Sequence, residues 1–270
     1  LFLIGTHLKC VYSYMIKFIN EKKLYIILGI VFVLVILGVI AYKDMINNVI
    51  IGDARIETYS QDFITTLQSF NGVTFSKMFL SDFIYKPYFS IYLIFILIIA
   101  VNVFSNDYKS GNLKFALLTN TTVTQLYLGK VVFMMLVSTM IVSINFLLSL
   151  IVGQIAFGGS IIIAQLVEVL VLYFMSIIPA VVFSLIISLI SLTKLSSNII
   201  IGGSIGAIIL FGIIDTLTKF RYVSPIGILS FFQEGIPAFN NSMIISLSMA
   251  LMYIILLSIG LVKITNKVDY

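Results

Sequence analysis

Long stretches of this chain contain no charged residue, and this feature limits its possible folds more than any other. From Leu24 to Tyr42, 19 consecutive residues are uncharged and almost all are apolar. Only 10% of the 270 residues are charged, against about 25% in a soluble domain, and the mean hydropathy is +1.16. A soluble core could not bury so many apolar side chains, so lipid must surround these stretches.

The apolar stretches predict helices rather than strands. In hydrocarbon every backbone amide and carbonyl group needs a partner within the protein, so a membrane-spanning segment is a helix or part of a closed barrel. Barrel strands alternate polar and apolar residues with a period of two, whereas these stretches are unbroken. We therefore expect an all-α polytopic membrane protein with a single transmembrane domain over residues 1–270.

Six apolar runs are long enough to cross a bilayer. We expect spans at residues 24–42, 88–104, 126–152, 161–192, 198–217 and 243–262. The fourth run is too long for one straight span, and Pro179 predicts a kink in it. The segment from Lys43 to Pro87 is polar and carries several acidic residues, so we expect it to lie outside the membrane.

The first residues predict an amphipathic helix over residues 8–22. The apolar residues that share one predicted face are Leu8, Val11, Tyr12, Met15, Phe18 and Ile19. The opposite face carries Lys9, Lys17 and Glu21. This pattern is typical of a helix that lies in the membrane interface, although a solvated helix at a partner contact is an alternative.

The distribution of Lys and Arg predicts the orientation. With six spans, both termini lie on one side, together with the loops at residues 105–130 and 193–197. These segments hold ten of the 16 Lys and Arg residues, and the longer segments on the other side hold six. The positive-inside rule therefore places both termini and these two loops in the cytoplasm.

A short polar and basic stretch, NDYKSGNLKFALLTNTTVTQLYLGK, separates the second and third apolar runs, from Asn106 to Lys130. Its centre is an apolar run from Leu113 to Leu118, and Thr119 to Thr122 offers N-caps for the helix that continues into the third span. The pattern indicates a short helix, a break and a second helix start. Such a helix would lie along the membrane surface and face a cytosolic partner; a solvated connector is the alternative.

This stretch resembles the type-2 ATP-binding-cassette exporter permeases. The residues that carry the resemblance are Asp107, Gly111, Leu113, Leu117, Leu118, Thr119, Leu128, Gly129 and Lys130. The family usually has Glu at the position of Asp107 and Pro at the position of Asn120. The layout is also similar: an interfacial N-terminal helix, six spans, a long kinked fourth span and a broken segment between spans five and six.

The resemblance implies that the loop carries a coupling helix that docks into a groove on a separate cytosolic ATPase subunit. The residues that it assigns to this contact are Asp107, Lys109, Gly111, Leu113, Phe115, Leu117 and Leu118. ATP and Mg²⁺ would bind to that partner, and this chain would carry no cofactor. The resemblance also implies a second permease copy or a paralogue, with a pathway built from spans one, two and five of both, in a bacterial plasma membrane.

Four polar residues within or beside the apolar runs are candidates for the pathway. Glu168 is an intramembrane carboxylate in the predicted fourth span, either functional or paired at the outer interface. Asp215 ends the predicted fifth span, where it either lines an outer vestibule with Arg221 or merely marks a helix end. Asn102 and Asn145 are expected to form interhelical hydrogen bonds rather than to bind a ligand.

Small residues and one lysine suggest how the helices pack. Gly202 and Gly206 form a small-xxx-small face that serves packing either within the subunit or across a dimer. Gly129 is expected to allow close helix packing. Lys130 is expected to extend its side chain to the inner headgroups.

The sequence lacks the residues that several classes of function require. The single His and the single Cys, His7 and Cys10, have no ligand-type partners at a suitable spacing, so we expect no metal site. The sequence contains no phosphate-binding loop and no hydrolase motif, and we expect no catalytic residue. The positive loops account for the net charge of +5, so nothing indicates binding to nucleic acid.

The resemblance thus implies the membrane subunit of an ATP-driven exporter, and the few charges in the spans favour an amphipathic cargo: a peptide, a drug or a lipid-linked molecule. A gradient-driven secondary carrier is the main alternative. It would need intramembrane ionisable residues and commonly has internal repeats, and here Glu168 is available but no repeat is visible. A membrane enzyme is a third possibility, but it would need a catalytic polar cluster at one membrane face, which the sequence lacks.

Overall fold

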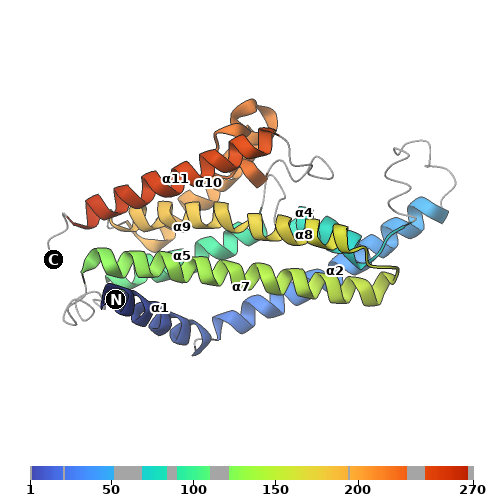
Figure 1. The fold of residues 1–270 in the computed structure, drawn as a ribbon, viewed down its shortest axis with the longest axis horizontal. Helices are drawn as coiled ribbons and strands as arrows, with labels where there is room; N and C mark the ends of the chain where they lie inside the picture. The colour runs from blue at the N-terminus through green and yellow to red at the C-terminus, as the bar shows by residue number, and fades with distance from the viewer. Residues whose placement is uncertain are drawn as a thin grey trace.

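The computed structural model describes residues 2–20, 22–51, 69–83, 90–109, 122–193, 195–229 and 241–266. The regular elements within these ranges are all helical, as the sequence predicted, and most of them run along one long axis (Figure 1). In chain order they are α1 (Phe2–Asn20), α2 (Lys23–Ile51), α4 (Gly72–Phe83), α5 (Ile91–Lys109), α7 (Val123–Phe157), α8 (Ile163–Met175), α9 (Ile177–Ser191), α10 (Ser197–Leu217), η2 (Lys219–Tyr222) and α11 (Asn241–Thr265).

Five segments of the described residues are long and apolar enough to cross a bilayer. They are Leu24–Asn48, Val123–Phe157, Ile163–Ser191, Ser197–Asp215 and Ile244–Thr265. The remaining expected span, at residues 88–104, corresponds to α5, whose apolar part, Ile91–Ser105, is shorter. The chain is therefore an all-α polytopic membrane protein, and six spans remain a prediction.

Helix α7 is the centre of the bundle and contacts α1, α2, α4, α5, α8, α9 and α11. It begins at a capping box, in which the Thr122 hydroxyl accepts from the Gln125 amide and the Gln125 side chain accepts from the Thr122 amide. It ends at Gly158, which has a φ of 69°. Between these signals, 35 residues form one unbroken helix.

The long fourth apolar run is broken at Ser176, between α8 and α9. Pro179 explains the place of the break, because a proline ring clashes with the carbonyl group four residues earlier, here that of Met175. The Ser176 hydroxyl donates to the Tyr173 carbonyl at 2.6 Å. The kink expected from Pro179 is therefore present, about one turn before the proline itself.

The polar segment expected from Lys43 to Pro87 contains a packed helix that we did not predict. Helix α4 lies against α7 and α8 at the end of the bundle away from both termini (Figure 1). Gly153 makes this close approach possible, since a Cβ atom there would lie 2.5 Å from Cδ1 of Phe75. The expectation failed because the apolar residues of α4 alternate with polar ones, which lowers the average hydropathy of the segment. The helical spacing of Phe75 and Phe79 was the available signal.

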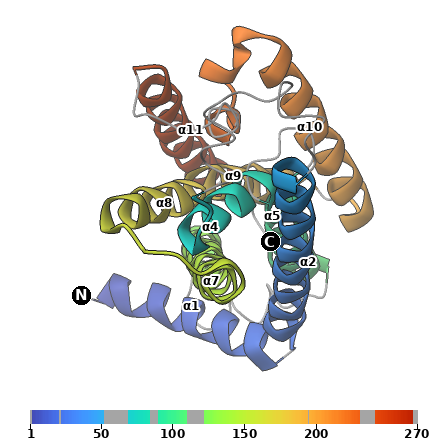
Figure 2. The ribbon, with the colours of Figure 1, turned by 90° about the vertical axis from the view of Figure 1, so that its right-hand side faces the viewer.

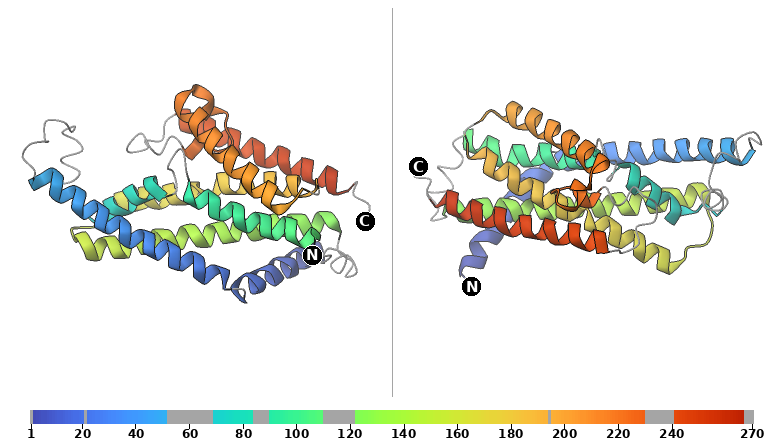
Figure 3. Two further views of the ribbon diagram at one scale, coloured as in Figure 1. Left: turned by 180° about the vertical axis from the view of Figure 1, so that it is seen from behind. Right: turned by 90° about the horizontal axis from the view of Figure 1, so that it is seen from above.

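Helices α2, α5 and α10 lie on one face of the bundle, whereas α8 and α11 lie on the other side (Figure 2; Figure 3, left). Helix α10 contacts α5 directly. From Tyr25 to Ala41 in α2, and from Ile199 to Ile214 in α10, each exposed residue is apolar or glycine. This face therefore offers an apolar surface to the surroundings.

Helix α1 packs against α7 through part of the predicted face. Val11 and Phe18 are buried, whereas Tyr12, which the pattern grouped with them, is 68% exposed. The rings of Tyr14 and Phe18 lie 5.8 and 5.9 Å from that of Phe133. The difference arises because α7 offers an aromatic partner, which the periodicity of α1 alone cannot reveal.

Candidate functional site

The α4–α8 end of the bundle is held together by buried hydroxyl groups. The hydroxyls of Ser76 on α4 and Ser149 on α7 lie 2.8 Å apart, and the Ser149 hydroxyl lies 3.0 Å from that of Tyr173 on α8. The Tyr173 hydroxyl also donates to the Ser76 carbonyl at 3.1 Å. All three side chains are fully buried. Three helices are thereby fixed relative to one another by bonds that each satisfy a buried polar group.

An ion pair joins α4 and α8 beside this cluster. The Lys77 ammonium lies 3.1 Å from Oε1 of Glu168, and the two side chains are 23% and 33% exposed. Of the two interpretations of Glu168, the geometry matches pairing between helices. The sequence could not show this pair because its members are 91 positions apart and only the fold brings them together.

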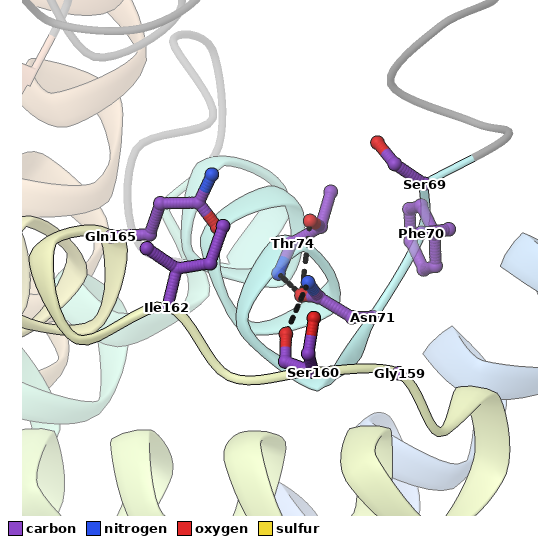
Figure 4. Close-up of a pocket in the computed structure, with 8 residues that line it drawn as sticks. All are labelled: Ser69, Phe70, Asn71, Thr74, Gly159, Ser160, Ile162 and Gln165. Atoms are coloured by element: carbon purple, nitrogen blue, oxygen red, sulfur yellow. Dashed lines mark hydrogen bonds between the residues drawn. The ribbon is translucent and has the colours of Figure 1, made fainter.

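A polar pocket of about 300 Å³ opens at the same end, between the start of α4 and the turn from α7 to α8 (Figure 4). Asn71 organises it: its Oδ1 accepts from the Thr74 amide at 2.9 Å, and its Nδ2 donates to the Ser160 carbonyl at 3.2 Å. Ser69, Phe70 and Gln165 complete the wall around these groups. Among the described residues that line the pocket, hydroxyl and amide groups share the wall with Phe70 and Ile162, and none of these residues is charged.

The turn that forms one wall of the pocket depends on two glycines. Gly158 and Gly159 have φ angles of 69° and 83°, which other residues rarely adopt. A Cβ atom on Gly159 would also lie 2.9 Å from Cβ of Asn71. The Gln154 side chain donates to the Gly159 carbonyl at 2.8 Å. The turn thus fits tightly against the start of α4, which gives the pocket a fixed wall.

Lys130 lies in an aromatic cage at the opposite end of α7. Its ammonium group is 5.6 Å from the ring of Tyr14, 5.7 Å from that of Phe104 and 5.2 Å from that of Tyr127. The side chain is fully buried. The expectation that Lys130 extends to the headgroups is therefore wrong, because rings from α1, α5 and α7 surround the ammonium group and favour it electrostatically.

The two predicted intramembrane asparagines differ. Asn102 donates to the Ile98 carbonyl of its own helix at 2.9 Å. Asn145 is fully buried in α7, and its side-chain amide has no hydrogen-bond partner among the described residues. The structure therefore gives no hydrogen bond from Asn145 to a neighbouring helix within the described part of the chain, contrary to the expectation.

Asp215 does not line an open vestibule. Its side chain is 1% exposed, and its oxygens have no hydrogen-bond partner in the described part of the chain, although the Ser224 side chain faces it. Residues 224–229, which follow η2, are also buried. Arg221 lies over the ring of Tyr222, 5.7 Å from its centroid, and its carbonyl accepts from the Ser246 hydroxyl. The vestibule interpretation of Asp215 is therefore wrong in this structure.

The two packing glycines face outward. A Cβ atom on Gly202 or on Gly206 would meet no atom within 4 Å in the described structure. Packing within the subunit therefore does not explain this small-xxx-small face. Both glycines belong to α10, one of the three helices that share the apolar face.

Most of the residues assigned to coupling lie outside the described part of the chain. Gly111, Leu113, Phe115, Leu117 and Leu118 lie outside the described residues. Asp107 and Lys109 belong to the last turn of α5, but their side chains are not described. The chain leaves α5 and enters α7 at the end of the bundle that also holds both termini (Figure 1).

Among the described residues, no group of three or more His, Cys, Asp or Glu side chains is arranged to hold a metal ion. Neither a family model, nor a curated protein, nor a solved structure matches this chain.

Proposed function

We propose that this chain is the membrane-spanning permease subunit of an ATP-driven exporter in a bacterial plasma membrane. Two such subunits, identical or paralogous, would form the pathway between them. Separate cytosolic ATPase chains of the cassette type would bind ATP and Mg²⁺ and engage the loop at residues 105–130. Both termini would then lie in the cytoplasm, in agreement with the distribution of Lys and Arg.

One observation carries the proposal more than any other: α2, α5 and α10 share one face of the bundle (Figure 3, left). They correspond to spans one, two and five, from which the resemblance builds the pathway. The exposed residues in the central parts of α2 and α10 are apolar or glycine. A pathway between two such faces suits an amphipathic cargo such as a peptide, a drug or a lipid-linked molecule, and it disfavours a bare ion.

The outward-facing glycines add support. Gly202 and Gly206 allow the backbone of another helix to approach α10 closely, because nothing in the described part of the subunit occupies that space. The loop between α5 and α7 starts and ends at the end of the bundle that carries both termini and the aromatic cage of Lys130. A partner that binds this loop would therefore act next to the contact between α1 and α7.

The experiment that tests the proposal is recovery of the subunit from its native membrane in a mild detergent, followed by mass spectrometry. We expect a soluble cassette-type ATPase in stoichiometric amount. Replacing Leu117 and Leu118 by Glu should remove the ATPase and leave the subunit inserted. Leu195→Glu, in the other loop expected on the same side, is the matched control and should keep it. Repeated recovery of the folded chain alone would favour a gradient-driven carrier.

Substitution of two glycines tests whether α10 contacts the second permease chain. Gly206→Leu, on the shared face, should reduce recovery of the second permease chain. Gly260→Leu, on α11, should not, although Gly260 also has nothing within 4 Å in the described structure. Equal recovery with both variants would argue against α10 as part of the contact.

A further inference from the structure

We propose that the pocket between α4 and the α7–α8 turn binds an uncharged, hydroxyl-bearing group about the size of one sugar ring. The group would be a free sugar or the headgroup of a neutral glycolipid. The pocket lies between α4 and α8, at the end of the bundle away from the termini (Figure 1). The inference does not rest on the proposed exporter function, because its test uses no ATPase.

The size of the pocket limits the ligand. Its volume of about 300 Å³ places it at the small end of ligand pockets, which span about 300–1,000 Å³. The wall comes from the start of α4, from the turn and from α8, and the buried hydroxyl cluster fixes these elements relative to one another. The pocket is therefore preformed and small.

The polar groups in the wall select the chemistry. The Gln165 amide and the Ser160 hydroxyl make no hydrogen bond with other described side chains or backbone groups, so both remain available. The Thr74 hydroxyl lies within 3.2 Å of Asn71 Oδ1, to which it donates, and it keeps its acceptor capacity. Donors and acceptors thus converge from three elements, an arrangement that suits a ligand with several hydroxyl groups.

Charge disfavours ionic ligands. The ion pair Lys77–Glu168 lies one helical turn beyond Thr74 on α4 and beyond Gln165 on α8, on the same faces. Its charges neutralise each other at 3.1 Å. An anionic or cationic ligand would find no counter-charge among the described residues of the wall, so a neutral one is favoured.

The test uses the full chain in phosphatidylcholine nanodiscs, because sugar-headed detergents would compete. Calorimetric titration with N-acetylglucosamine should give saturable binding. Glucosamine and glucuronate, which carry a positive and a negative charge, should bind at least tenfold more weakly. Gln165→Leu should weaken binding of N-acetylglucosamine about tenfold, the loss of one or two hydrogen bonds. Asn198→Leu, an exposed polar residue of α10 outside the pocket, should leave it unchanged.

A second readout separates the two sources. The sequence contains no Trp, so Ile162→Trp at the pocket rim gives a single fluorescent reporter. If a lipid headgroup is the ligand, the Trp emission should change when monoglucosyl diacylglycerol is included in the disc. If a free sugar is the ligand, the emission should change only when free sugar is added. Failure of free sugar and of glycolipid to give any signal would overturn the proposal. Stronger binding of a charged sugar, or unchanged binding by Gln165→Leu, would also overturn it.

Discussion

Gly153 on α7 and Phe75 on α4 lie so close that a Cβ atom on the glycine would come within 2.5 Å of the phenylalanine ring. Phe75 is fully buried; its ring stacks on that of Phe79 and also contacts the rings of Phe157 and Tyr42. The contact joins a helix that hydropathy did not predict to the longest helix of the bundle. The hydroxyl cluster, the Lys77–Glu168 ion pair and the polar pocket all include residues of α4, so they depend on this contact.

Gly153→Ala should therefore destabilise the protein by about 1–3 kcal/mol, because the added methyl group forces Phe75 to move within a packed core. Gly29→Ala on α2 is the matched control, since nothing in the described structure lies within 4 Å of its Cβ position. It should be neutral or stabilise by up to about 1 kcal/mol through helix propensity. Thermal unfolding in nanodiscs measures both. Phe75→Leu in the Gly153→Ala background should restore part of the loss; a lack of difference between the two glycines would contradict the packing.

Lys130→Met should loosen the contact of α1 with the bundle. The ammonium group is within 6 Å of three ring centroids, and such contacts contribute about 0.5–2 kcal/mol. We expect faster hydrogen exchange of the α1 amides, measured by mass spectrometry. Lys130→Arg should retain most of the protection because it keeps the cation. Lys219→Met, at an exposed lysine, should leave exchange in α1 unchanged; if Lys130→Met does the same, the cage does not hold α1.

Asp215→Asn should stabilise the protein. A carboxylate that is buried without a hydrogen-bond partner among the described residues is unfavourable when charged, and an isosteric amide removes the charge. Asp82→Asn should behave differently, since Asp82 accepts a hydrogen bond from the Tyr42 hydroxyl and is exposed. It should be neutral or slightly destabilising. The comparison needs only the thermal midpoints of the two variants and the parent, and a lower midpoint for Asp215→Asn would show that its charge is compensated.

Glu168→Gln and Lys77→Met should each lower stability by about 0–1 kcal/mol, because the pair is partly exposed and such pairs contribute little. The exchanged pair, Lys77→Glu with Glu168→Lys, should recover much of the loss. A double-mutant cycle from thermal unfolding gives the coupling. If Glu168→Gln instead abolished transport while stability stayed intact, Glu168 would have a functional role beyond this pair.

The sequence predicts the five apolar helices that are long enough to span a membrane, because hydropathy summed over about 20 residues is a local property. It also predicts the break near Pro179, which follows from the missing amide hydrogen and the ring of one residue. It does not predict α4, which is stabilised because Phe75 and Phe79 pack against other helices. Nor does it predict the environment of Lys130.

The candidate site, too, was predicted only where a single residue stands out in the local sequence, and not where its features depend on contacts between helices. Glu168 was recognised as unusual from its place in an apolar run, but its partner Lys77 lies in a segment that the sequence assigned to a polar loop. The pocket was not predicted at all, since Asn71, Ser160 and Gln165 carry no motif. The assignment of Leu117 and Leu118 to an ATPase contact remains a prediction.

The unbroken length of α7 has a mechanical consequence. At 35 residues it measures about 52 Å, well beyond the roughly 30 Å of hydrocarbon in a bilayer. The fourth apolar run bends at Ser176, whereas α7 runs as one rod past it. A rigid rod of this length acts as a lever: a tilt of about 5° at one end moves the other end by about 5 Å. A push near Lys130 would therefore reach the turn of Gly158 and Gly159, and α4 and α8 would move with it because the buried hydroxyl cluster joins them to α7.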